Sequence, residues 1–101
     1  MVKKRSNAKA PLKNKPKNAS PENYFILVTG VPVKNLKELA NSFESMNDWV
    51  FNHHVNESRN DFAAWMHDIL SEEELAQEIS LIKEMKDMEH RILKHMVNKY
   101  L

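Results

Sequence analysis

Four side chains near the middle of the chain have the chemistry of metal ligands, namely His53, His54, His67 and Asp68. A zinc site needs three or four such ligands that converge on one point, with hydrogen-bonding partners behind them. The chain has no Cys, and these histidines lack the His-x-x-x-His spacing that puts two rings on one face of a helix. We therefore predict no metal site and no cofactor.

His54 has a simpler structural interpretation. It falls on the apolar side of a helix predicted over 48–55. A histidine in that position is expected to be partly buried, with a ring nitrogen hydrogen-bonded to Asp61 or to a backbone group. Asp61 follows Asn60, and an Asn cap followed by an acid in the first turn favours the start of a helix without any catalytic role.

Other patterns that carry catalysis are missing from the sequence. It has one Gly and no Gly-rich phosphate loop, and its spacing singles out no Ser/His/Asp arrangement. The sequence therefore predicts a protein that is not an enzyme. A metal-assisted activity around His54 and His67 stays open as an alternative.

The charge of the chain is unevenly distributed along its length. The formal net charge is +1, but residues 1–21 carry seven basic residues and no acid, which leaves 8 basic and 14 acidic residues, or −6, in residues 22–101. The seven are Lys3, Lys4, Arg5, Lys9, Lys13, Lys15 and Lys17. Three prolines and few apolar residues predict that 1–21 is a disordered tail, because it cannot bury enough surface to offset its ordering entropy. Such a tail is typical of segments that contact phosphates of DNA, of RNA or of anionic lipid headgroups, while a solubilising tail, or one folded back on the acidic body, stays open.

The pattern of residues 22–101 predicts one small, mainly α-helical domain that begins with a short β element. The apolar run 24–28 predicts a strand, and Thr29-Gly30 predicts a turn to a second arm at 31–33. Helices are predicted over 36–46, over 48–55, after the Asn60 cap, and from Ser71 to the C-terminus. Trp65 is expected in the core and Trp49 on the surface.

The last of these four helices is the longest. About 28 residues without Gly or Pro would extend about 42 Å, which exceeds the width of so small a domain. Whether it breaks near 83–86 stays open. Its second apolar stripe predicts an interface with a second copy or another protein, while packing on the chain's own core is the alternative. The residues of this predicted interface are Met85, Met88, Ile92, Met96 and Tyr100.

The stretch 25–75 resembles an uncharacterised small domain of archaeal and bacterial proteins. The residues that carry the resemblance are Asn35-Leu36-Lys37-Glu38-Leu39-Ala40, Met46, Phe51, His54-Val55, Asn60-Asp61-Phe62, Trp65 and Leu75-Ala76. The resemblance implies a shared fold, in which Asn35, Glu38, His54, Asn60, Asp61, Phe62 and Trp65 are structural, and it implies no activity. The basic tail and the long final helix lie outside it.

These patterns together predict a non-enzymatic interaction protein. Its helical body is expected to self-associate or to bind a protein partner, while its basic tail contacts nucleic acid without sequence specificity. The alternative is a protein–protein adaptor with a merely solubilising tail. No run of about 18 apolar residues could span a membrane, and no apolar signal segment follows the basic N-terminus, which predicts a cytoplasmic location.

Overall fold

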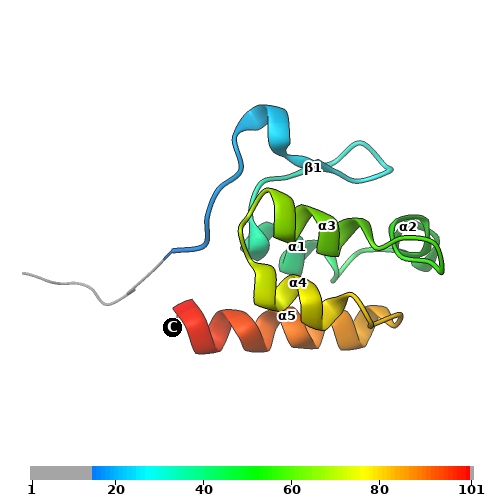
Figure 1. Cartoon of the computed structure of the whole chain (residues 1–101). Coiled ribbons are helices and arrows are strands. Elements are labelled where there is room, and N and C mark those ends of the chain that lie inside the picture. Colours follow the sequence, from blue (N-terminus) through cyan, green and yellow to red (C-terminus); the bar gives the residue numbers. More distant parts are fainter. Residues whose placement is uncertain (1–14, 101) are drawn as a thin grey trace, which may run out of the picture.

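A computed structural model describes residues 15–100, and it is mainly helical with a short antiparallel hairpin near its start (Figure 1). This confirms the predicted fold class. The elements are η1 (Pro21–Asn23), β1 (Phe25–Ile26), β2 (Pro32–Val33), α1 (Leu36–Ser42), α2 (Asp48–His54), α3 (Asp61–Asp68), α4 (Glu73–Ile79) and α5 (Met85–Tyr100).

The hairpin forms where the β-branched and aromatic run predicts it. Phe25 pairs with Val33, and the Leu27 N–H donates to the Val31 carbonyl at 2.9 Å. Gly30 closes the turn at a φ of +94°, in the left-handed region that only Gly enters without strain. Alternation along β1 and the residues after it buries Phe25 and Leu27 and leaves Ile26 and Val28 exposed.

Two asparagines start helices as predicted. The Asn35 side chain accepts the Glu38 N–H at 2.8 Å to cap α1, and the Asn60 side chain accepts the Ala63 N–H at 3.0 Å to cap α3. α1 ends earlier than the predicted 46, because the chain turns after Ser42 toward α2.

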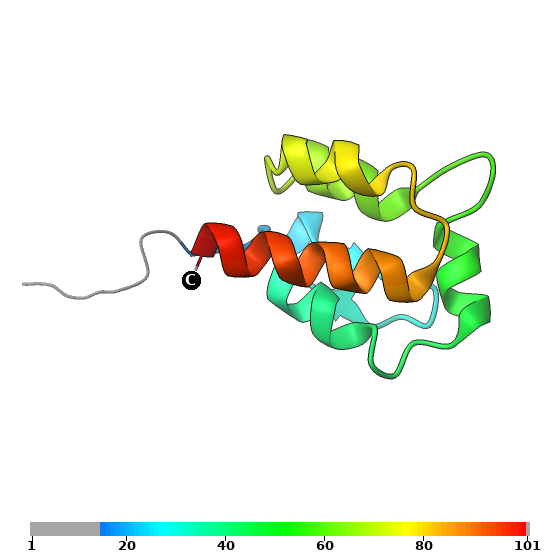
Figure 2. The same ribbon diagram turned by 90° about the horizontal axis from the view of Figure 1, so that it is seen from below.

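The predicted last helix is two helices. α4 ends at Ile79 and α5 begins at Met85, so the chain turns back and packs α5 against α4 and α1 (Figure 2). One straight helix could not hold both of its apolar stripes against a single core. The start is also displaced from the predicted Ser71 cap, since Ser71 has a φ of +59° and the helix begins at Glu73.

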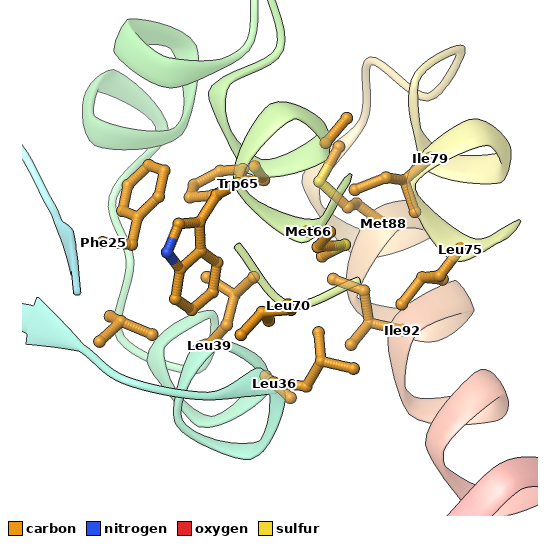
Figure 3. Close-up of a cluster of buried hydrophobic side chains, with 14 of the residues drawn as sticks. Phe25, Leu36, Leu39, Trp65, Met66, Leu70, Leu75, Ile79, Met88 and Ile92 are labelled. Carbon is orange, nitrogen blue, oxygen red and sulfur yellow. The ribbon is translucent and has the colours of Figure 1, made fainter. Parts of the chain in front are cut away.

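The buried apolar side chains form one cluster that all five helices and the hairpin share. Figure 3 shows Phe25 and Trp65 on one side of it and Ile79, Met88 and Ile92 on the other. Trp65 is in the core, as predicted, and its Nε1–H donates to the Asn23 carbonyl at 2.8 Å.

Candidate functional site

The basic N-terminal segment meets the folded body at Ala19. Ala19 is buried and its N–H donates to the Lys34 carbonyl at 2.8 Å, while Asn18 Oδ1 accepts from Asn35 Nδ2 at 2.8 Å. The folded body therefore starts a few residues before the predicted boundary at 22.

Of the seven predicted nucleic-acid contacts, Lys15 and Lys17 lie within the described residues, and both are exposed. The other five, Lys3, Lys4, Arg5, Lys9 and Lys13, lie outside them. The segment around Lys15 lies at the same end of the molecule as the C-terminal end of α5, whereas the hairpin turn and α2 lie at the opposite end (Figures 1 and 2).

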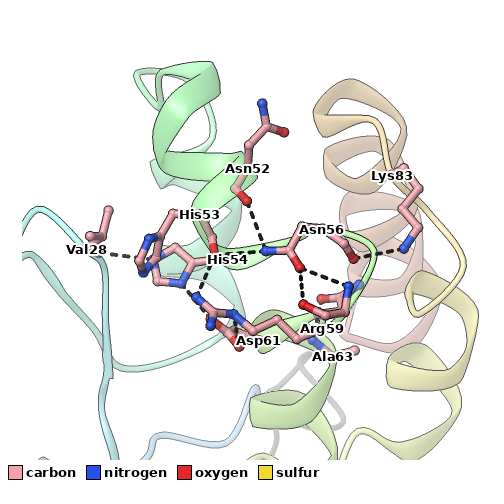
Figure 4. A network of polar contacts seen from close by, with 11 residues as sticks. Val28, Asn52, His53, His54, Asn56, Arg59, Asp61, Ala63 and Lys83 are labelled. Carbon is pink, nitrogen blue, oxygen red and sulfur yellow. Dashed lines mark hydrogen bonds and ion pairs between the residues drawn. The ribbon is translucent and has the colours of Figure 1, made fainter.

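His54 is 5% exposed and uses both ring nitrogens within the fold (Figure 4). Its Nδ1 lies 3.0 Å from Asp61 Oδ2, and its Nε2 accepts the Val28 N–H at 3.0 Å. These bonds join α2 to α3 and to the hairpin. The sequence predicts a bond from His54 to Asp61 or to a backbone group, and the structure contains one bond of each kind. A general base needs a free ring nitrogen within reach of substrate, and here Nε2 is already occupied. His54 therefore acts as a structural link.

Polar contacts near His54 and Asp61 also hold the loop between α2 and α3, residues 55–60. The Arg59 guanidinium donates to the His53 carbonyl at 2.8 Å, and its Nε lies 3.4 Å from Asp61 Oδ1. Lys83 Nζ donates to the Asn56 carbonyl at 3.1 Å, which ties this loop to the connection between α4 and α5 (Figure 4).

The candidate metal ligands His53, His54, His67 and Asp68 do not converge on one point. Within residues 15–100, no group of three or more His, Asp or Glu side chains is arranged to hold an ion. His67 pairs with the neighbouring Asp68 at 2.9 Å on the surface of α3, and this contact, chiefly its hydrogen bond, raises the pKa of His67.

The predicted partner interface on the last helix faces inward. Met88 and Ile92 are fully buried and Tyr100 is 7% exposed. Met85 and Met96 are partly buried against the same cluster. These five residues complete the chain's own core, because the break before α5 turns their stripe back onto α1 and α4. Most of this stripe is therefore taken up by contacts within the chain.

The body also holds a buried carboxylate. Glu72 is 4% exposed, and its Oε1 accepts from His95 Nε2 at 2.9 Å and from Lys99 Nζ at 3.1 Å, while its Oε2 accepts from the Tyr100 hydroxyl. Burial by itself raises the pKa of Glu72, but the hydrogen bonds from Tyr100, Lys99 and His95 outweigh it and the pKa is lowered. Burial by itself lowers the pKa of Lys99, but the contacts with Glu72 outweigh it and the pKa is raised, while burial together with the contacts with Glu72 raises the pKa of Tyr100.

A protein-family model matches residues 17–101, and its description is a family of unknown function, DUF5752. The chain belongs to this family. No curated protein and no solved structure matches the chain.

The DUF5752 match confirms the resemblance to an uncharacterised domain and extends it at both ends. It includes α5 and starts at Lys17, so Ala19 and the Glu72 contacts on α5 fall inside the family's span. Residues 1–16, with six of the seven cations of the N-terminal segment, fall outside it.

The Glu72 cluster of this DUF5752 domain is missed by the sequence reasoning. The three consecutive glutamates 72–74 suggest the acidic first turn of a helix, and nothing in that pattern distinguishes Glu72 as the buried one. A signal exists on α5, where His95 and Lys99 continue the spacing of Met88 and Ile92. Polar groups on a buried line require a polar partner.

Exposed apolar side chains gather elsewhere on the DUF5752 domain. The outer side of the hairpin exposes Ile26 and Val28, the turn exposes Val31, and the first turn of α2 exposes Trp49, as predicted for this tryptophan. A cavity of about 320 Å³ opens between the hairpin turn and the start of α2. Among the described helices, none is long and apolar enough to cross a membrane.

Proposed function

We propose that the protein is a non-enzymatic interaction protein. Its basic N-terminal segment, residues 1–21, contacts nucleic acid without sequence specificity, and its folded DUF5752 body self-associates or binds a protein partner. A cytoplasmic location is part of the proposal.

The separation of charge along the chain carries the proposal. Seven basic residues without an acid precede a body of formal charge −6. A polyanion is repelled by such a body and attracted by such a segment, where each cation that meets a phosphate releases condensed counterions.

The junction between segment and body also supports the proposal. Ala19 is anchored by burial and by its bond to Lys34, so Lys15 and Lys17 stand just outside the packed body with exposed side chains. Within residues 15–100, neither Lys15 nor Lys17 forms an ion pair, so their positive charges lie next to the body without being neutralised.

The experiment is fluorescence anisotropy of a labelled mixed-sequence duplex with the full chain, between 50 and 200 mM salt. If all seven cations meet phosphates, log affinity falls with log salt with a slope of about −6. A variant with Lys3, Lys4, Arg5, Lys9 and Lys13 changed to Gln should lose most of the binding, and its slope should shrink to about −2.

A control variant neutralises two exposed cations of the body. Lys86→Gln with Lys94→Gln should leave binding within a factor of about two, because α5 lies on the acidic body. A slope near zero, or equal loss in both variants, contradicts the nucleic-acid proposal. An adaptor with a solubilising tail then becomes the better interpretation.

A further inference from the structure

The N-terminal segment joins the body beside the end of α3. Lys17 lines a hollow of about 340 Å³ together with Asp68 and Ile69, which are the last residue of α3 and its C-cap. Figure 1 shows the chain from Lys15 onward at the end of the molecule where α3 ends and α4 begins. Residues 1–14 are therefore attached next to the junction of α3 and α4.

A groove between α3 and α4 begins at this junction. Its volume is about 450 Å³, and its lining residues are Ala63, Ala64, His67, Glu73, Ala76 and Gln77. His67 is bonded to Asp68 at 2.9 Å, so the groove adjoins the hollow that contains Lys17. Three of the lining residues are alanines, whose short side chains leave room between the two helices for an extended chain.

The charge of this α3–α4 groove suits a basic occupant. Glu73 is exposed and forms no ion pair within residues 15–100, and Asp68 adds a second carboxylate at the junction. No Lys or Arg lines the groove. The groove between α4 and α5 is lined by Arg91 and Lys99 as well as by two acids, and the cavity beside the hairpin turn has no charged lining residue.

The N-terminal segment has a composition and a length that fit this groove. Residues 8–13 read Ala-Lys-Ala-Pro-Leu-Lys, so small and apolar residues separate Lys9 from Lys13, and Pro11 favours an extended backbone at Ala10. At about 3.3 Å per residue, the 14 residues before Lys15 reach about 46 Å. The 7 residues of α4 rise about 10 Å, so the segment can follow the whole groove.

From these observations we infer that residues 8–13 occupy the α3–α4 groove of their own chain when no nucleic acid is bound. Their lysines then lie beside Asp68 and Glu73. Nucleic acid has to displace them, so the acidic body limits the affinity of its own basic segment for phosphates. The contact needs no nucleic acid, but this regulatory effect rests on the proposed function.

The contact should be weak and sensitive to salt. Ion pairs between exposed side chains contribute little each, while the tether keeps the segment at a high effective concentration. We expect the groove to be occupied in about half to three quarters of the molecules at 50 mM salt, which would weaken duplex binding about twofold to fourfold. At 0.5 M salt, screening should release the segment.

The test is paramagnetic relaxation enhancement on the full chain without nucleic acid. The chain contains no Cys, so a nitroxide attached to Asn7→Cys, just before residues 8–13, reports from a single position. At 50 mM salt it should broaden the amide signals of Ala64 and Gln77 in the groove. The signal of Gly30, in the hairpin turn at the opposite end of the molecule, should stay sharp. At 0.5 M salt the broadening should disappear.

Two double variants remove the same charge from different grooves. Asp68→Asn with Glu73→Gln should abolish the broadening and raise the affinity for the duplex at 50 mM salt about twofold to fourfold. Glu74→Gln with Glu78→Gln is the matched control, because these exposed residues line the α4–α5 groove. It should keep the broadening. Since both variants change the net charge equally, a difference between them reports on the α3–α4 groove.

Several results would overturn the inference. They are the absence of broadening at 50 mM salt, broadening that survives Asp68→Asn with Glu73→Gln, and equal effects of the two double variants. A mixture of ¹⁵N-labelled chain without nitroxide and unlabelled chain with nitroxide distinguishes the copies. Broadening in that mixture would place the segment of another copy in the groove and would also contradict the inference.

The docked segment and the proposed function can fail separately. If the unaltered chain does not bind the duplex, the nucleic-acid proposal is wrong, whatever the nitroxide shows. If the chain binds the duplex but the nitroxide broadens no signal in the groove, the docked segment is wrong and the proposed function stands.

Discussion

The side chain of Asn60 joins the start of α3 to Ile79, 19 residues on at the end of α4, because its Nδ2 donates to the Ile79 carbonyl at 3.0 Å while its Oδ1 caps α3 through Ala63. The same residue therefore starts α3 and satisfies a carbonyl in the last turn of α4. This contact holds the α3–α4 pair at one end.

Two substitutions of Asn60 distinguish the contribution of its bond to Ile79 from that of its cap on α3. Asn60→Ser keeps a capping oxygen but loses the bond to Ile79, so it should lower the free energy of unfolding by about 1 kcal/mol. Asn60→Ala loses both bonds and should lower it by about 2 kcal/mol. Urea unfolding followed by circular dichroism at constant m-value measures both. An unchanged stability of Asn60→Ser would show that the Ile79 bond contributes nothing, and equal losses in the two variants would show that the cap contributes nothing.

The bonds of His54 should hold the hairpin against α2. His54→Phe keeps a ring beside Phe25 and Phe62 but leaves the Val28 N–H and Asp61 without their partner. We expect a loss of about 2 kcal/mol in unfolding free energy and faster hydrogen exchange at the Val28 amide. An unchanged exchange rate at Val28 would contradict this link.

Glu72 should stabilise the end of α5 at neutral pH. Glu72→Gln removes the charge that His95, Lys99 and Tyr100 share, and should lower the free energy of unfolding by about 2 kcal/mol. Glu73→Gln removes the same charge from an exposed position and should change it by less than about 0.5 kcal/mol.

The contribution of Glu72 should depend on pH in a defined direction. The folded-state pKa of Glu72 is lowered below its ordinary value, so the stabilisation is complete above pH 4.5 and is lost as pH falls through the folded value. The pKa values of Tyr100 and Lys99 are raised, so their contributions are present below pH 10 and fade above it. The difference between the unaltered chain and Glu72→Gln, measured from pH 3 to 9, should be constant above about pH 5 and smallest at pH 3.

Truncation should locate the start of the folded body. Removal of residues 1–14 leaves Ala19 and its bond to Lys34 in place and should not change the free energy of unfolding at 0.5 M salt, where the N-terminal segment is released. Removal of 1–21 deletes a buried methyl group and that hydrogen bond, and should cost about 1–2 kcal/mol. Equal stability of the two truncated chains would place the boundary after 21. Both are measured by thermal and urea unfolding.

Local signals in the sequence determined much of this protein. The hairpin follows from a β-branched run with a Gly turn, and α1 and α3 follow from Asn caps with apolar residues at helical spacing. The bond between His54 and Asp61, seven residues on, follows from a polar ring on a buried face, and the charge separation is visible without any structure. Each of these depends on neighbours within a few residues or on composition.

The tertiary structure alone decided the rest. No Gly or Pro marks the break after Ile79, because it is imposed by the need to bring Leu75, Ile79, Met88 and Ile92 against one core. The same turn buries the stripe that an unbroken helix offers to a partner, and it brings His95, Lys99 and Tyr100 back to Glu72 across 23 to 28 residues. Such pairings depend on how elements pack against each other, which the spacing within a single helix does not determine.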